Sequence, residues 1–181
     1  MKQIRKNMKN PQSLYWQIYG LLNRLSSSVN QAVEYLLFVL GFSMALVVAL
    51  QVFFRYVLNN SLFWSEELAR FLLVWLTFLG ASAAYRRGVH PGIDVFFSRM
   101  PTVMQRISMI LVHLSSLFLF GVMIFFGCRF AWFVRSQISP ALHMPKWIIM
   151  SIIPASGTLL AIHGLVFLLG ILGEKEKTLG N

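Results

Sequence analysis

The chain has 181 residues, of which 57% are apolar and 12% charged, and its mean hydropathy is +0.66. This composition is too apolar for an ordinary water-soluble domain, which argues against a soluble enzyme. The formal net charge of +10 would suggest nucleic acid as the partner of a soluble protein, but beside such hydropathy it points to membrane lipids, and no nucleic-acid partner is expected.

The first 32 residues form a basic segment with an apolar pattern. Behind Pro11, apolar side chains recur at helical spacing: Leu14, Ile18, Leu21, Leu22, Leu25 and Val29. Such a stretch predicts an amphipathic helix that lies along the cytoplasmic interface. The alternative is a tail that only orients insertion into the membrane.

Four apolar stretches follow, at about residues 33–57, 61–85, 103–128 and 147–172. About 20 apolar residues cross the hydrocarbon of a bilayer as a helix, and lipid leaves no partner for an unpaired backbone amide. We therefore expect an all-α membrane protein with a four-helix transmembrane domain at 33–172 and a cytoplasmic tail at 173–181. Between the first two spans, Asn59-Asn60-Ser61 is interpreted as a helix stop and restart.

Basic residues are divided unequally between the two sides of this arrangement. Eleven lie before the first span, between the second and third, or after the fourth. The other side carries four: Arg55, Arg129, Arg135 and Lys146. The positive-inside rule predicts that both termini are cytoplasmic and that segments 58–65 and 129–146 face outward.

Charged residues near the hydrocarbon are informative, because each costs about 2.5–3.5 kcal/mol at a helix centre unless it is paired or solvated. Glu66, Glu67 and Arg70 lie near the start of the second span, and their spacing places them together on one helix. We interpret them as an ion-pair cluster at the outer interface. The alternative is contact with a partner subunit or with a moving helix.

Two histidines, His113 and His163, each lie roughly ten residues from the cytoplasmic end of a span and so could share a depth. We expect packing histidines whose hydrogen bonds come from a neighbouring subunit or from nearby hydroxyls: Ser115, Ser116, Ser156 and Thr158. Axial ligation of a haem in a four-helix bundle and a proton relay are the alternatives.

Small residues close the second span, where Gly80 and Ala84 form a small-x-x-x-small pair that allows a neighbouring helix to approach. With the aromatic Trp75 and Phe78, they are the candidate subunit-packing residues. Gly157 and Gly164 offer a second face of this kind.

The sequence contains no nucleophile with a base and an orienting acid, no glycine-rich phosphate cradle and no His/Cys metal spacing. No catalytic, cofactor-binding or metal-binding residue is therefore assigned, and an enzyme is not expected. A self-sufficient transporter usually has a polar site at the bilayer midplane. Because the cores of the first two spans offer few polar side chains, such as Gln51, Thr77 and Ser82, the chain is better interpreted as an accessory subunit.

The run QVFFRYVLNNSLFWSEELAR at 51–70, continued by LVWLTFLGA at 73–81, resembles the small membrane subunit (DctQ-type) of tripartite ATP-independent periplasmic (TRAP) transporters. Arg86 to His90, with Asp94, adds to the likeness. The resemblance implies a non-catalytic partner of a large permease subunit in the bacterial inner membrane. Together the two subunits would work with a periplasmic solute-binding protein to import an organic acid, driven by a sodium gradient. Sialic acid and C4-dicarboxylates are both compatible with the resemblance as solutes.

From this resemblance we expect a scaffold that braces the large subunit. Three outward cations, Arg129, Arg135 and Lys146, have no acidic residue beside them in the segment 129–146 and are candidates for docking the binding protein. Alternatively, they anchor the helix ends to lipid headgroups. For the whole chain, the alternatives are an autonomous small four-helix exporter and a membrane haem protein that uses His113 and His163.

Overall fold

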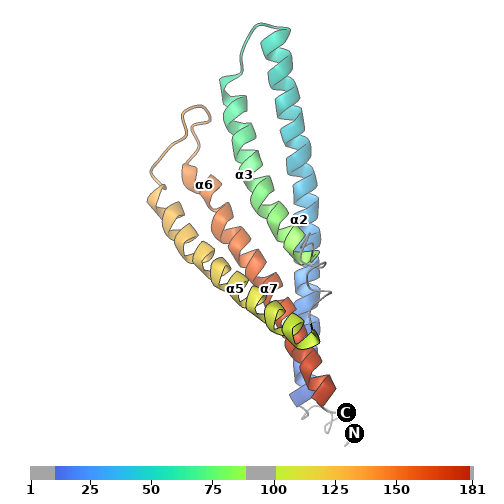
Figure 1. Cartoon of the computed structure of the whole chain (residues 1–181). Helices are drawn as coiled ribbons and strands as arrows, with labels where there is room; N and C mark the ends of the chain where they lie inside the picture. Colours follow the sequence, from blue (N-terminus) through green and yellow to red (C-terminus); the bar gives the residue numbers. More distant parts are fainter. Residues whose placement is uncertain (1–10, 89–100, 180–181) are drawn as a thin grey trace, which may run out of the picture.

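The computed structural model describes residues 11–88 and 101–179, which fold almost entirely as helices (Figure 1). The helices are α2 (Pro11–Tyr56), α3 (Phe63–Arg86), α5 (Thr102–Phe133), the short α6 (Lys146–Met150) and α7 (Ile152–Leu179). Within this part of the chain, four stretches are long and apolar enough to cross a membrane: Trp16–Tyr56, Phe63–Arg86, Ile107–Phe133 and Lys146–Ile171. The expectation of four helices able to span a membrane is therefore confirmed.

The helices form two antiparallel pairs, α2 with α3 and α5 with α7, and α3 supplies most of the contact between the pairs. The connections 57–62 and 134–145 lie at one end of the molecule, which we call the hairpin end (Figure 1). The start of α2 and the end of α7 lie together at the other end, the terminal end. The pairs converge toward the terminal end and splay apart toward the hairpin end.

Helix α2 differs from the expected N-terminal arrangement. It runs without interruption over 46 residues, about 69 Å at 1.5 Å per residue, so the N-terminal segment continues the first span rather than forming a separate helix. Tertiary contacts favour this continuity, because Val29 and Val33 pack in the core shared with α3 and α7. Whether the N-terminal part of α2 lies at a membrane interface stays a prediction.

The fourth span begins with a break that the apolar pattern does not reveal. Helix α6 ends at Met150, and α7 begins at Ile152. Pro154 explains the break, because a proline ring clashes with the carbonyl four residues earlier and the residue has no N–H to donate. At the α2–α3 connection, Asn59 has a φ of 50°, a left-handed conformation that asparagine tolerates, at the predicted stop between two helices.

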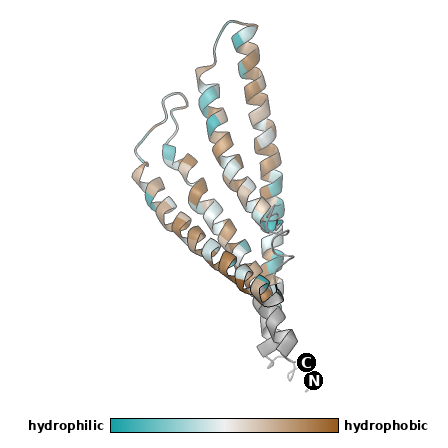
Figure 2. Cartoon of the chain, in the orientation of Figure 1, coloured by the Kyte–Doolittle hydropathy of each residue, from teal (hydrophilic) through white to brown (hydrophobic). Residues whose placement is uncertain are grey.

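The buried core is small, and most large apolar side chains are exposed. One core cluster contains Val33, Leu79, Ala83 and Ile152, and a second contains Tyr85, Phe120 and Leu160. Brown, hydrophobic residues run along most of the length of the helices, and hydrophilic residues gather near the hairpin connections and where the helices converge (Figure 2). Many of the large apolar side chains are exposed, such as Phe38, Phe118 and Phe133. This distribution suits helices surrounded by lipid or by partner helices rather than by water.

Candidate functional site

Near the start of α3, the three charged residues of the predicted cluster have two different roles. Arg70 Nη2 lies 3.1 Å from Glu66 Oε1 in an exposed pair one helical turn apart. Glu67 instead turns toward the 134–145 hairpin, where its Oε2 accepts the backbone N–H groups of Ala141 at 2.8 Å and Leu142 at 3.0 Å. The sequence spacing indicates the first contact, whereas the second joins residues 74 and 75 positions apart.

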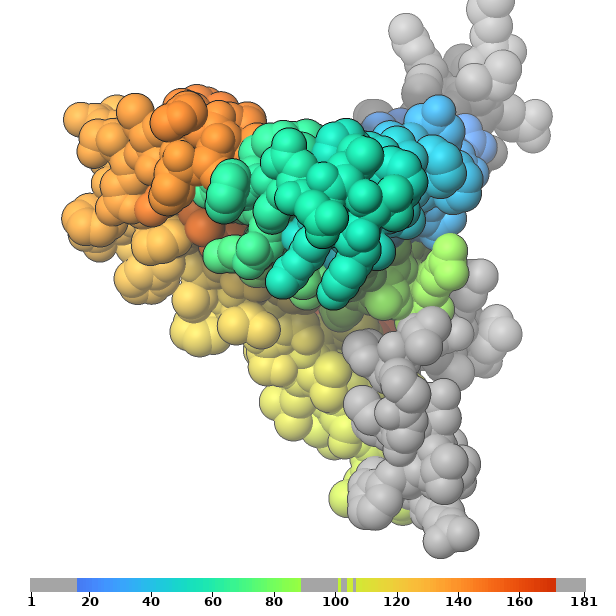
Figure 3. All heavy atoms as spheres, turned by 90° about the horizontal axis from the view of Figure 1, so that it is seen from above, coloured from blue at the N-terminus to red at the C-terminus, as the bar shows by residue number. Residues whose placement is uncertain are grey.

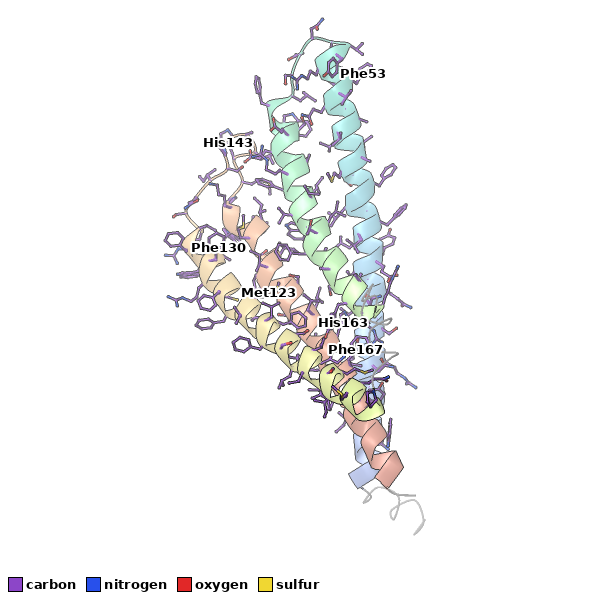
Figure 4. All side chains as sticks on the ribbon, in the orientation of Figure 1. Phe53, Met123, Phe130, His143, His163 and Phe167 are labelled. Carbon is purple, nitrogen blue, oxygen red and sulfur yellow. The ribbon has the colours of Figure 1, made fainter. Side chains whose placement is uncertain are left out.

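The 134–145 hairpin has a defined internal geometry. Ser139 donates its N–H to the Met144 carbonyl at 2.9 Å, and Lys146 donates its N–H to the Gln137 carbonyl at 2.9 Å. Ser139 is 1% exposed, and His143 occupies the left-handed region with a φ of 53°. Figure 4 labels His143 at this hairpin, beside the start of α3.

The predicted docking cations all lie at the hairpin end. Arg135 lies over the Trp132 ring at 4.0 Å from its centroid, and Arg129 lies over the Phe125 ring at 5.8 Å. Lys146 Nζ donates to Gln137 Oε1 at 3.3 Å. Seen from the hairpin end, this segment (orange) lies to one side of the α2–α3 connection (teal), so it extends the end surface of the molecule (Figure 3).

Toward the terminal end, polar side chains join the two helix pairs. His163 on α7 is fully buried, and its Nδ1 lies 2.7 Å from Ser26 Oγ on α2. His113 Nδ1 on α5 lies 3.0 Å from Tyr85 Oη on α3. Figure 4 labels His163 and Phe167 on the same stretch of α7. Both histidines therefore connect helices, as packing histidines should.

The partners of these histidines differ from the predicted hydroxyls. Ser115 and Ser116 donate to the Val112 carbonyl, and Ser156 and Thr158 likewise donate to carbonyls of their own helix. The reason is geometric: a serine or threonine inside a helix readily reaches the carbonyl three or four residues earlier. The observed partners lie on other helices, which spacing along one helix cannot indicate.

The arrangement around His113 does not fit a haem held between the two histidines. Phe167 stacks on the His113 ring at 5.6 Å, and Tyr85 packs edge-on against both rings. Two aromatic side chains thus pack against the His113 ring, one of them on its face. Over the described residues, no group of three or more His, Cys, Asp or Glu side chains could hold a metal ion.

Two basic residues at the end of α3, the second of them its C-cap, anchor the helix to α2. Arg86 donates to Asn23 Oδ1 at 2.6 Å, and Arg87 Nη2 lies 3.0 Å from Glu34 Oε1. An autonomous exporter would need a buried acid of its own, and Glu34, the acidic residue near the first span, is partly exposed and paired with Arg87. Asp94, which contributes to the family resemblance, lies outside the described residues.

The candidate subunit-packing residues divide between two faces of α3. Trp75 and Phe78 are partly buried against the Val33–Ile152 core cluster within the chain. A β-carbon added at Gly80 would have no atom within 4 Å, and Ala84 is exposed. Gly157 and Gly164 pack closely on α5 as expected, but Gly127, which the sequence pattern did not single out, makes the closest approach of all the described glycines.

These features are those of a multi-pass membrane protein. Within the described residues, its polar side chains largely form contacts within and between its own helices. The family follows from sequence comparison. The chain belongs to the DctQ component family of tripartite ATP-independent periplasmic transporters, because the family model matches residues 44–173. The resemblance found in the sequence is therefore confirmed.

The names of individual relatives refer to different transported solutes. The chain is 30% identical over 105 residues to the C4-dicarboxylate TRAP transporter small permease protein DctQ of Rhodobacter capsulatus, covering 57% of this chain and 46% of that protein. It is 30% identical over 111 residues to the sialic acid TRAP transporter small permease protein SiaQ of Vibrio cholerae, covering 61% and 64%.

A longer relative contains a region similar to this chain. The isethionate TRAP transporter permease protein DctMQ of Oleidesulfovibrio alaskensis is 30% identical over 122 residues, which cover 65% of this chain and 19% of that protein. The chain thus spans about a fifth of DctMQ and about half of the Rhodobacter protein.

Proposed function

We propose that this chain is the small permease subunit of a TRAP transporter in the bacterial inner membrane, where it braces a large permease subunit. With a periplasmic solute-binding protein, the assembly imports an organic acid with a sodium gradient. The observation that carries the proposal is the DctQ family match over most of the chain. The DctMQ relative supports a permanent association, because there a similar region forms part of one longer permease polypeptide.

The internal contacts support a bracing role. An elevator-type carrier needs a stationary part against which its transport domain moves. In this chain, hydrogen bonds join the two helix pairs near both ends: Glu67 to the 134–145 hairpin, and Ser26 to His163. A bundle fastened at two separated levels resists relative movement of its helices more than one fastened at a single level.

The face of α3 that contains Gly80 and Ala84 is the proposed contact with the large subunit. Thr77, Ala81 and Ala84 are exposed, and the space beside Gly80 is open. Small residues allow a partner helix to approach closely in lipid, where van der Waals packing drives association. Trp75 and Phe78 support this face from the opposite side of α3 by packing into the core.

The bracing role is tested by omitting this subunit from cells that produce the large subunit and the binding protein. Uptake of the solute that the intact transporter carries should be lost, although the large subunit still reaches the membrane. Full uptake by the large subunit alone would contradict the proposal.

The contact face is tested by co-purification of the two subunits. Gly80→Leu should reduce recovery of the large subunit, because leucine fills the space that a partner helix needs. Gly121→Leu on α5 is the matched control, since Gly121 also has open space beside it. Equal recovery with both variants would place the contact elsewhere.

We further propose that both termini are cytoplasmic and that Arg129, Arg135 and Lys146 help dock the binding protein. A positive end surface attracts an acidic protein, with an effect that weakens as salt rises. Replacing the three cations with Glu should slow uptake while complex assembly stays intact. Unchanged uptake kinetics would favour a role in anchoring to headgroups, and a C-terminal reporter accessible from the periplasm would refute the orientation.

A further inference from the structure

A carboxylate of the other helix pair, that of Glu67, contacts the 134–145 hairpin. Glu67 Oε2 accepts two backbone N–H groups of the hairpin. Hydrogen bonds to an ionised acceptor are roughly twice as strong as neutral ones. Glu67 is on α3 and the hairpin connects α5 to α6, so this contact holds the two helix pairs together where their ribbons splay apart (Figure 1).

The hairpin closes on itself without Glu67. Two backbone hydrogen bonds join the arms of the hairpin. At its base the Lys146 N–H donates to the Gln137 carbonyl, and nearer the tip the Ser139 N–H donates to the Met144 carbonyl. Ala141 and Leu142 occupy the tip, beyond the bond between Ser139 and Met144. Loss of Glu67 would therefore leave the hairpin folded but free to tilt away from α3.

Tilting the hairpin would move the cations at its base. Arg135 leads into the hairpin and lies over Trp132, and Lys146 leaves it at the start of α6. At this end the two carboxylates are already engaged, Glu66 with Arg70 and Glu67 with the hairpin. The charge left for a partner is therefore positive, and its complement is the acidic surface of a soluble protein.

We infer that Glu67 is a positioning residue: it fixes the 134–145 hairpin against α3 and thereby sets the geometry of the basic surface that an acidic solute-binding protein recognises. This inference rests on the proposed docking role of the cations. Glu67 itself does not contact the binding protein. Its carboxylate acts through the backbone of Ala141 and Leu142 and through the side chain of Ser139.

The test measures binding of the solute-binding protein to the assembled transporter in nanodiscs. Glu67→Ala should raise the dissociation constant about tenfold, a change of about 1.4 kcal/mol. The dissociation constant of Glu67→Gln should lie between those of the wild type and Glu67→Ala, because the glutamine amide oxygen still accepts an N–H but carries no charge. Glu66→Gln is the matched control: it removes the neighbouring carboxylate, which pairs with Arg70 and not with the hairpin, and should leave binding near the wild-type value.

A second measurement separates positioning from direct contact. Hydrogen exchange of the Ala141 and Leu142 amides, measured without the binding protein, should be faster in Glu67→Ala and intermediate in Glu67→Gln. Faster exchange with unchanged binding would refute the positioning role, as would unchanged exchange. If Glu67→Ala does not assemble with the large subunit, Glu67→Gln is judged by the same two criteria.

Charge-reversal variants of the cations distinguish failure of this inference from failure of the docking proposal. If Arg135→Glu weakens binding but Glu67→Ala does not, docking stands and the positioning role is wrong. If Arg135→Glu and Lys146→Glu both leave binding unchanged, the docking surface itself is wrong, and the inference falls with it.

Discussion

The packing of α5 on α7 makes a sharp prediction at Gly127. This buried glycine lies against Pro154, and a β-carbon placed on it would be 2.9 Å from Pro154 Cδ and 3.1 Å from the Pro154 backbone nitrogen. The second contact is with backbone, which cannot rotate away as a flexible side chain can. Gly121, six residues earlier on α5, has nothing within 4 Å of the same position.

The two glycines allow the clash to be measured separately from helix propensity. Replacing glycine with alanine inside a helix stabilises it by about 0.8–1.0 kcal/mol, and this gain applies to both variants. Only Gly127→Ala adds a cost of overpacking, which is typically about 1–3 kcal/mol. The difference between the variants should therefore be about 2 kcal/mol, with Gly127→Ala the less stable.

The assay is thermal melting of the purified protein in detergent. Melting is measured as the loss of the monodisperse gel-filtration peak after heating. A difference of about 2 kcal/mol corresponds to roughly 4–8 °C for a chain of this size. Unfolding of membrane proteins in detergent is commonly irreversible, so both variants are heated at one rate and compared directly. If Gly127→Ala melts at or above the temperature of Gly121→Ala, the close approach of α5 and α7 is wrong.

Two further predictions concern polar contacts. Ser26→Ala should lower stability by about 1–3 kcal/mol, because it leaves both ring nitrogens of the buried His163 without a hydrogen-bond partner among the described residues. Ser27→Ala, at an exposed neighbour, should change the melting temperature little, and equal effects of the two substitutions would count against the buried contact. Glu34→Gln should change the melting temperature little, because the pair of Glu34 with Arg87 is partly exposed and solvent weakens such pairs, and a loss as large as that of Ser26→Ala in the same assay would contradict this assignment.

The spans could be predicted from local pattern because each depends on a property of a short stretch. Runs such as Phe71–Tyr85 contain no charged residue, and a helix is the only way for such a run to satisfy its backbone in lipid. The Glu66–Arg70 pair could likewise be predicted, because residues four apart on a helix are neighbours. The family resemblance also depended on a contiguous run of residues.

The contacts between helices could not be predicted in the same way. The hydrogen-bond partner of His163 is Ser26, 137 residues away, and the N–H groups that Glu67 accepts lie at the hairpin tip. Apolar pattern gives each helix a length but not the rotation about its axis, and side chains that are apolar on every face leave that rotation open. For the same reason Gly127 resembled any other glycine until its distance to Pro154 was known.

The amino-acid sequence by itself determined that this protein has four helices able to cross a membrane and that it is a DctQ-type subunit, because hydropathy and a contiguous motif are local properties. The tertiary structure alone decided which helix faces meet and which polar groups join them, and so revealed that Glu67 fastens the 134–145 hairpin to α3. These contacts depend on the rotation and crossing of helices far apart in the chain, and no local pattern specifies them.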